Sequence, residues 1–154
     1  MKKIVFLIIA SMLMSIMLTG CGGGETLTLN VYNWGEYISD GSEGSFDTVK
    51  EFEKWYKETY GQKVNVNYTT YASNEDMYNK ISSGAVSYDV IIPSDYMIAR
   101  MVNEGLLQPL NFDNIPNYKN IDSNFKGLYY DADNLYSVPY AYGIVGVIYD
   151  ANVV

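Results

Sequence analysis

Alternation of apolar and polar residues predicts two β-strands early in the chain, at residues 27–31 and 63–69, because successive side chains of a strand point to opposite faces. A continuous apolar run at residues 90–92 is typical of a central strand that is buried on both faces. Two later stretches, residues 136–139 and residues 143–149, also predict strands, and the second of them is rich in Val and Ile.

Three segments between these strands have the period of a helix. Aromatic and apolar residues recur at steps of three and four over residues 49–60, and Gly61 provides a stop. A second helix is predicted over residues 73–83, with Ser73 as its N-cap. A third is predicted to begin at Ser94 or Asp95 and to end near residue 105, whereas residues 109–133 are polar and irregular. This order predicts an α/β domain with a largely parallel sheet flanked by helices.

The first twenty residues have the parts of a secretory signal: a basic start, a short apolar core and the ending Leu18-Thr19-Gly20-Cys21. That ending resembles the bacterial lipobox, in which the cysteine is lipidated and becomes the new N-terminus. An N-terminal membrane anchor is the alternative, although the apolar run is short for a membrane span. The expected segments are a signal peptide at 1–20, a lipidated Cys21 with a Gly-rich tether at 21–26, and a folded domain at 27–154.

The composition limits the chemistry that the domain can perform. Ten Lys and Arg against 18 Asp and Glu give a formal net charge of −8, which argues against a nucleic-acid partner. The chain has no His, so catalytic Ser–His and Cys–His pairs and His–metal sites are excluded. The single Cys excludes an internal disulfide and a multi-cysteine metal site. We therefore expect no metal and no cofactor.

Two loops at the ends of predicted strands carry the candidate chemistry. Asn33-Trp34-Gly35-Glu36-Tyr37 follows the first strand, and Pro93-Ser94-Asp95-Tyr96 follows the third. Open α/β sheets bind ligands at the carboxyl ends of their strands. An aromatic face attracts a cation and a carboxylate binds an ammonium group, so the pairing fits an amine whose methylenes pack on the rings. The candidate binding residues are Trp34, Glu36, Tyr37, Ser94, Asp95 and Tyr96.

Each candidate also has a plain structural interpretation. Trp34 can belong to the core, Glu36 can be a solvated loop acid, and Ser94 or Asp95 can simply cap a helix. A carbohydrate hydrolase would need two facing carboxyl groups, for which Glu36 and Asp95 are available, but their spacing does not specify such a pair. The sequence has no phosphate-binding Gly-rich loop and no nucleophile elbow.

Five motifs resemble the first lobe of the bacterial spermidine/putrescine-binding proteins, the extracytoplasmic receptors of polyamine ABC importers. The match covers about residues 27–152, and the order and spacing of its motifs agree along the chain. The motifs are Asn-Trp-Gly-Glu-Tyr at 33–37, Thr-Tyr-Ala-Ser-Asn-Glu-Asp-Met-Tyr-Asn-Lys at 70–80, Tyr-Asp-Val-Ile-Ile-Pro-Ser-Asp-Tyr-Met at 88–97, Gly-Leu-Leu-Gln-Pro-Leu at 105–110 and Ser-Val-Pro-Tyr-Ala-Tyr-Gly at 137–143.

This resemblance implies a two-lobed type II periplasmic-binding fold whose cleft closes over a polyamine. The permease would recognise the closed form. It implies a non-enzymatic receptor that is anchored to the membrane by lipid, in the periplasmic space or on the outer face of the cytoplasmic membrane. Trp34 would stack on the methylenes, Glu36 would receive an ammonium group, and Tyr37, Ser94 and Tyr96 would line the cleft. Asp95 stands where family members vary, and Tyr142 takes a position that is Trp-like in the family.

Members of the resembled family are considerably longer than 154 residues. The expectation is therefore a partial sequence or a truncated product that contains the first lobe and lacks the second. Four alternatives stay open from the sequence: a binding lipoprotein for an amino acid, sugar or metal chelate, a surface-anchored carbohydrate hydrolase, a purely structural lipoprotein, and a non-functional remnant.

Overall fold

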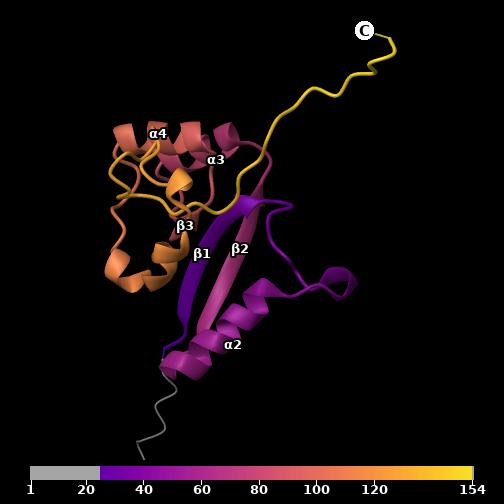
Figure 1. Cartoon of the computed structure of the whole chain (residues 1–154). Coiled ribbons are helices and arrows are strands. Elements are labelled where there is room, and N and C mark those ends of the chain that lie inside the picture. Colours follow the sequence, from indigo (N-terminus) through magenta and orange to yellow (C-terminus); the bar gives the residue numbers. More distant parts are fainter. Residues whose placement is uncertain (1–24, 154) are drawn as a thin grey trace, which may run out of the picture. The chain divides into compact units, whose positions relative to one another are not determined.

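The computed structural model describes residues 25–153, so the predicted signal peptide and Cys21 lie outside the described residues. The described chain forms two compact units, one of residues 25–29 and 39–67 and the other of residues 30–38 and 68–153. Strands β1 (Leu27–Trp34) and β2 (Val64–Tyr71) contribute residues to both units (Figure 1). The two early strands predicted from the sequence are therefore confirmed.

The strands form one sheet in the order β2-β1-β3, where β3 is Val90–Ile91. β1 and β3 run parallel, with Val31 opposite Val90 and Tyr32 opposite Ile91, which confirms the predicted parallel arrangement for this pair. The prediction that the third strand is buried on both faces is wrong, because Val90 is 43% exposed. In the described part of the chain, β3 lies at the end of the strand order and pairs with β1 alone.

The first unit contains the 3-10 turn η1 (Ser42–Gly44) and the predicted helix, α2 (Thr48–Tyr60). The Asp47 side chain caps α2 by accepting a hydrogen bond from the Lys50 N–H. Gly61 ends α2 in the left-handed conformation, with φ at 69°. Glycine has no Cβ and adopts this conformation with little steric strain. The Val66 N–H donates to the Glu53 carboxylate across 2.7 Å and so joins β2 to this helix.

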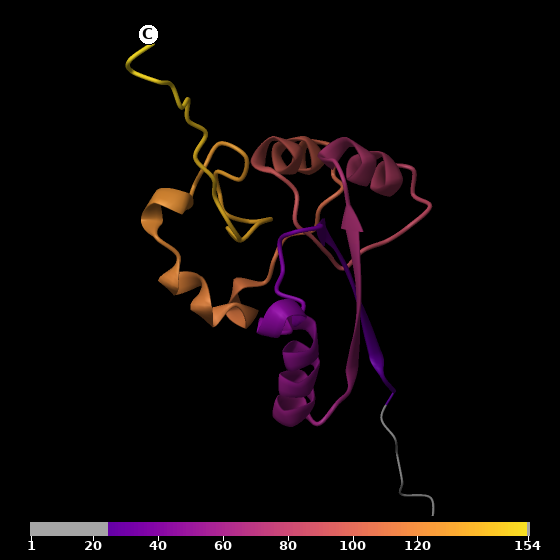
Figure 2. The ribbon, with the colours of Figure 1, turned by 90° about the vertical axis from the view of Figure 1, so that its right-hand side faces the viewer.

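The second unit contains the two other predicted helices, α3 (Asn74–Ser82) and α4 (Asp95–Asn103), which lie side by side in Figures 1 and 2. Ser73 caps α3 as predicted, since its hydroxyl accepts from the Asp76 N–H at 3.1 Å. The two helices are also joined at their surface. The Arg100 guanidinium lies 3.7 Å from the centre of the Tyr78 ring, and the Tyr78 hydroxyl donates to Glu104 across 2.6 Å.

A small core of aromatic and methionine side chains holds the second unit together. Burying a side chain of this size contributes about 1.5–3 kcal/mol. Partly buried residues, Trp34 among them, pack against this core. The buried members are Tyr32, Tyr71, Met77, Met97 and Met101.

Residues 109–133 are irregular, as predicted, and contain the 3-10 turns η2 (Phe112–Asn114), η3 (Pro116–Asn120) and η4 (Ser123–Phe125). Asp131 organises the following turn. Its carboxylate is 7% exposed and accepts four hydrogen bonds, from the backbone of residues 135–137 and from the Ser137 hydroxyl. Burial opposes the charge, but these donors outweigh it and lower the pKa of Asp131.

The strands predicted at 136–139 and 143–149 are wrong for the structure described here. The segment from residue 141 onward extends away from α3 and α4 (Figure 1), and Val145 and Ile148 are almost fully exposed. A strand needs a neighbouring strand to pair its backbone, and no described segment pairs with these residues.

No helix among residues 25–153 is both long and apolar enough to cross a membrane.

Candidate ligand-binding site

Four aromatic side chains form a continuous row at the end of β1, which we call the aromatic wall: Trp34, Tyr37, Tyr71 and Tyr140. Trp34 lies at its centre, with ring-centre distances of 4.7 Å to Tyr71 and 6.2 Å to Tyr37. Tyr140 extends the row and stacks on Tyr37 at 6.4 Å with 23° between the planes. Tyr37 and Tyr140 are 47% and 57% exposed, so this end of the wall is open to a ligand.

The backbone of Trp34 is positioned by a buried amide. Asn33 is 1% exposed, and its side-chain oxygen accepts a hydrogen bond from the Trp34 N–H at 2.7 Å. The Asn33 amide nitrogen donates to the Tyr68 hydroxyl at 2.8 Å. Both ends of the amide are therefore satisfied, and the start of the binding loop is fixed at the edge of the sheet.

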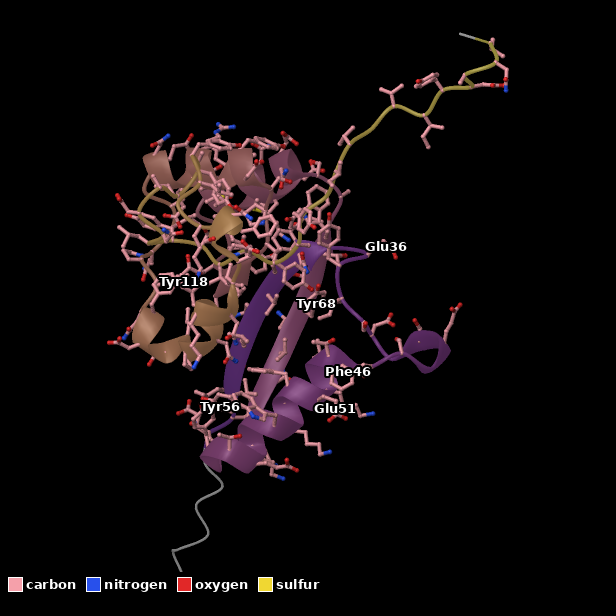
Figure 3. All side chains as sticks on the ribbon, viewed as in Figure 1. Glu36, Phe46, Glu51, Tyr56, Tyr68 and Tyr118 are labelled. Atoms are coloured by element: carbon pink, nitrogen blue, oxygen red, sulfur yellow. The ribbon has the colours of Figure 1, made fainter. Side chains whose placement is uncertain are left out.

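Glu36 lies on the loop that follows β1. Figure 3 shows its side chain pointing away from the ribbon, and the residue is exposed. Among the described residues, no ion pair involves Glu36. A carboxylate in this state is free to receive a cationic ligand.

The second loop is connected to the first turn of α3. Asn74 is 3% exposed, and its side chain accepts from the Ser94 N–H and donates to the Tyr96 hydroxyl. That hydroxyl in turn donates to the Glu75 carboxylate at 3.0 Å. Ser94 occupies the N-cap position of α4 without a side-chain cap, so its hydroxyl is not used by the helix.

Asp95 is the first residue of α4, and its carboxylate accepts from the Tyr96 N–H at 2.7 Å. It also accepts a hydrogen bond from the Tyr129 hydroxyl, which raises the pKa of that tyrosine. The structure therefore gives Asp95 a local role at the start of the helix, and any role in binding stays a prediction.

Tyr71 connects the two loops. Its ring packs on Trp34, and its hydroxyl donates to the backbone carbonyl of Ile92, two residues before Ser94. Burial raises the pKa of Tyr71, so its hydroxyl stays protonated and continues to donate this bond. The structure thus brings both predicted loops to the same edge of the sheet.

Tyr142 is the predicted residue that the structure does not bring to this edge. Its ring is 72% exposed and contacts Phe125 at 4.7 Å. No ring contact joins it to Trp34 or Tyr37 in the described structure.

Three acidic side chains lie on the elements that carry the candidate site: Glu36 on the first loop, Glu75 on α3 and Asp95 at the start of α4. Glu75 joins the predicted Glu36 and Asp95, and the two ion pairs found among residues 25–153 involve none of these carboxylates. No cluster of three metal-ligating side chains occurs among the described residues. Each of these carboxylates is of the type that accepts a charge-assisted hydrogen bond from an ammonium group.

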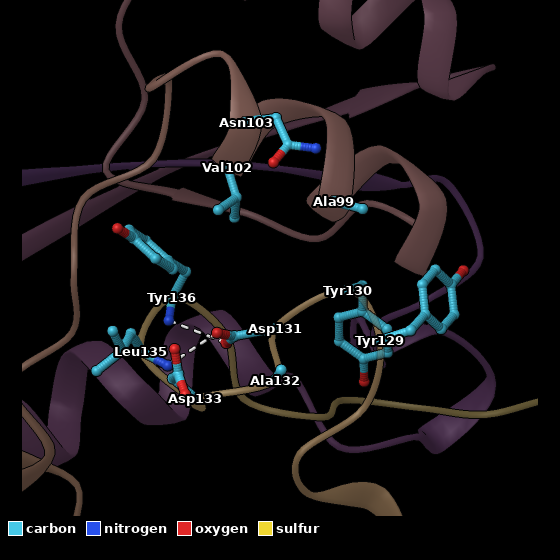
Figure 4. Close-up of a pocket in the computed structure, with 10 residues that line it drawn as sticks. All are labelled: Ala99, Val102, Asn103, Tyr129, Tyr130, Asp131, Ala132, Asp133, Leu135 and Tyr136. Carbon is cyan, nitrogen blue, oxygen red and sulfur yellow. Dashed lines mark hydrogen bonds between the residues drawn. The ribbon is translucent and has the colours of Figure 1, made fainter.

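A pocket of about 190 Å³ lies elsewhere in the second unit, between α4 and the turn around Asp131 (Figure 4). Its one buried carboxylate, Asp131, is occupied by backbone and Ser137 donors. Since no free polar group points into this pocket from a buried position, the aromatic wall is the better candidate site.

Sequence reasoning did not select Asn33, Tyr71, Glu75 or Tyr140 as site residues. All four lie within motifs that the resemblance had already marked, at residues 33–37, 70–80 and 137–143. What the sequence lacked was a signal for contact, since Tyr140 meets Tyr37 across 103 residues of chain.

Residues 43–154 match the family of bacterial extracellular solute-binding proteins. The chain is 32% identical to the putrescine-binding periplasmic protein PotF of Escherichia coli (strain K12) over 153 residues, covering 98% of this chain and 38% of that protein. The chain therefore spans about two fifths of the length of this relative.

Two solved structures are also similar. The spermidine/putrescine ABC transporter substrate-binding protein PotD from Streptococcus pneumoniae aligns with a TM-score of 0.61 and 38% identity, over 75% of this chain and 32% of that one. The TpPotD lipoprotein of Treponema pallidum aligns with a TM-score of 0.58 and 35% identity, over 74% of this chain and 32% of that one.

These likenesses confirm the predicted fold class. The structural neighbours are substrate-binding proteins of the periplasmic-binding type, and this chain has the same α/β construction, with parallel strands flanked by helices. The family match covers most of the chain. The chain therefore belongs to the bacterial extracellular solute-binding proteins.

Proposed function

We propose that this chain contributes the first lobe of an extracytoplasmic receptor that binds linear polyamines, spermidine or putrescine, for an ABC importer. The observation that carries the proposal is the aromatic wall beside carboxylates that lack ion-pair partners. Trp34 and Tyr37 supply the rings, and Glu36 supplies the nearest exposed charge on the same loop. We propose binding without turnover.

The chemistry of a polyamine fits each part of this edge. Its methylenes pack on Trp34 and Tyr37, and a ring face attracts an ammonium by about 0.5–2 kcal/mol. Glu36 accepts a charge-assisted hydrogen bond from a terminal ammonium. Ser94 and Tyr96 offer hydroxyl oxygens from the second loop, with Asp95 and Tyr142 as more distant contributors.

The relatives support this choice of ligand. The Escherichia coli relative is named as putrescine-binding, and the Streptococcus pneumoniae structure as a spermidine/putrescine substrate-binding protein. An amino acid, a sugar or a metal chelate is the competing ligand class. A neutral sugar has no ammonium group, and a diamino acid such as lysine carries a carboxylate beside one of its ammonium groups. A polyamine has only ammonium groups joined by methylenes, which is the feature that an aromatic surface flanked by carboxylates recognises.

The proposed location is the outside of the cytoplasmic membrane or the periplasm. Residues 1–20 would be removed, Cys21 would carry the lipid, and residues 21–26 would tether the domain at 27–154 near its permease. The similar Treponema pallidum protein is itself named a lipoprotein. Mass spectrometry of the expressed protein tests this, because Cys21→Ser should abolish the acyl mass and release the protein into the soluble fraction.

Calorimetric titration of the chain with spermidine and putrescine tests the site. Saturable binding is expected, with affinity reduced about tenfold or more in Trp34→Ala, because the aromatic surface and its attraction for cations are lost. Trp55→Ala is the matched control, since Trp55 is an exposed tryptophan on α2 in the other unit. Glu36→Gln should also weaken binding while keeping the shape of the loop.

Equal affinity in the chain and in Trp34→Ala would contradict the site. A higher affinity for arginine, maltose or a ferric chelate than for spermidine would show that the ligand belongs to the competing class. Absence of saturable binding to any of these ligands would contradict a ligand site formed by this chain.

A further inference from the structure

Tyr140 contacts the binding loop in two independent ways. Its hydroxyl donates a hydrogen bond to the backbone carbonyl of Tyr37, and its ring stacks on the Tyr37 ring at 6.4 Å. The loop at residues 35–38 is attached at its β1 end through the Asn33 amide, and directly after the loop the Ser39 carbonyl accepts a hydrogen bond from the Thr48 N–H at 3.0 Å. Tyr140 adds a contact to the loop itself, between these two attachments, from a segment 103 residues away.

Burial does not explain why an aromatic residue stands at this position. Tyr140 is 57% exposed, and it lies outside the core cluster of the unit. Its contacts are instead with the loop that carries Glu36. A residue that contributes little to the core but bonds to a binding loop is better explained by the geometry it imposes on that loop.

Tyr140 also lies near the support of Trp34. Burial raises the pKa of Tyr68, and the nearby Tyr140 hydroxyl raises it further. Tyr68 accepts the hydrogen bond from Asn33, and Asn33 holds the Trp34 N–H. Tyr140 thus contacts Tyr37 directly and lies near Tyr68, the residue that holds the Asn33 amide.

We propose that Tyr140 is a positioning residue of the polyamine site, which holds Tyr37 and the Glu36 loop in line with Trp34. The proposal rests on the proposed function for the ligand, but the geometry it describes is present without ligand. A preformed loop binds more tightly because the ligand does not have to order it. Neither contact requires Tyr140 to touch the polyamine.

The test uses the full chain with Trp55→Phe, which leaves Trp34 as the one tryptophan. Tyr140→Phe removes the hydroxyl and keeps the ring, and Tyr140→Ala removes both. Tyr118→Phe is the matched control, because it also loses a hydroxyl hydrogen bond in the same unit, to Asn134 at 2.9 Å. Acrylamide quenching of Trp34 fluorescence is measured without ligand, and spermidine affinity is measured by calorimetry.

Tyr140→Phe is expected to raise the quenching constant of Trp34, because Tyr37 no longer shields it steadily. It should weaken spermidine binding about threefold to tenfold, the range for one lost hydrogen bond. Tyr140→Ala should raise the quenching constant further and weaken spermidine binding further than Tyr140→Phe does. Tyr118→Phe should have the same quenching constant and affinity as the parent. Unfolding curves measured in urea identify any variant whose stability has changed.

Quenching and affinity equal to the parent in both Tyr140 variants would overturn the positioning role. The same changes in Tyr118→Phe would also overturn it, because a general loss of stability would then be the cause. If the parent itself does not bind spermidine, the proposed function fails, and the quenching constants still decide whether Tyr140 holds the loop.

Discussion

Asp131→Asn is expected to destabilise the second unit strongly, although it changes one atom. The Asp131 carboxylate is 7% exposed. One of its oxygens accepts from the Tyr136 N–H at 2.9 Å and from the N–H and hydroxyl of Ser137 at 2.8 Å each. The other oxygen accepts from the Leu135 N–H at 2.8 Å. Asparagine offers one oxygen and an NH₂ group, so it cannot accept on both sides.

The size of the effect follows from these four bonds. The amide oxygen can retain the three donors on one side, which leaves the Leu135 N–H facing another donor. Losing one hydrogen bond to a buried charge costs about 1.5–3 kcal/mol, and the three remaining bonds weaken because their acceptor is no longer ionised. We expect the free energy of unfolding to fall by about 3 kcal/mol in total.

Urea unfolding at several pH values measures this loss. The pKa of Asp131 is lowered in the folded chain from its ordinary value of 3.8. Its carboxylate therefore contributes stability that is fully present above about pH 4 and is lost as the pH falls through the folded pKa. The difference in the free energy of unfolding between the parent and Asp131→Asn should be constant near neutral pH. It should become smaller in acid, where the parent loses the charge on Asp131.

Asp133→Asn provides the matched control, since it makes the same change two residues away at an exposed side chain. The control should change the free energy of unfolding by less than about 0.5 kcal/mol. A loss below about 1 kcal/mol for Asp131→Asn, or a loss of the same size in both variants, would show that the four hydrogen bonds of Asp131 do not provide this stability.

Three further substitutions test the fold. Ser73→Ala removes the cap of α3 and should cost about 1 kcal/mol in urea unfolding, whereas Ser87→Ala should cost close to nothing; equal losses would contradict the role of the cap. Gly61→Ala should cost about 1 kcal/mol, because φ at 69° is unfavourable for a residue with Cβ. Gly146→Ala, in open space, should be nearly neutral by the same assay. Val147→Lys should leave the free energy of unfolding unchanged, because Val147 is 89% exposed; a loss above about 1 kcal/mol would contradict this exposure.

The early elements of the fold could be predicted because their signals are local. The alternation in β1, the helical period of α2 and the Ser73 cap each depend on residues within one element. The prediction failed for residues 143–149, since a Val- and Ile-rich segment forms a strand only when another strand pairs with it. The burial predicted for Val90 failed for a related reason, because a strand is central only through its neighbours.

The two loops of the candidate site could be predicted from the sequence. Trp34 and Ser94 follow strands, and parallel strands deliver their carboxyl ends to one edge. The residues that hold those loops were not predictable, because Asn33 and Tyr140 act through contacts that the sequence does not encode locally. The donors to Asp131 are only four to six residues away in the chain, but its role was still not predicted, since a single acid in a polar stretch looks like any solvated residue.

The most direct test of the binding site is an NMR titration of the chain with spermidine, observed at the two tryptophan indole N–H signals. Trp55→Phe assigns them, since one signal disappears and the other belongs to Trp34. A polyamine on the aromatic wall should shift the Trp34 signal in a saturable way and leave the Trp55 signal in place. A saturable shift at Trp55 alone, or no shift of either signal at millimolar spermidine, would contradict the account.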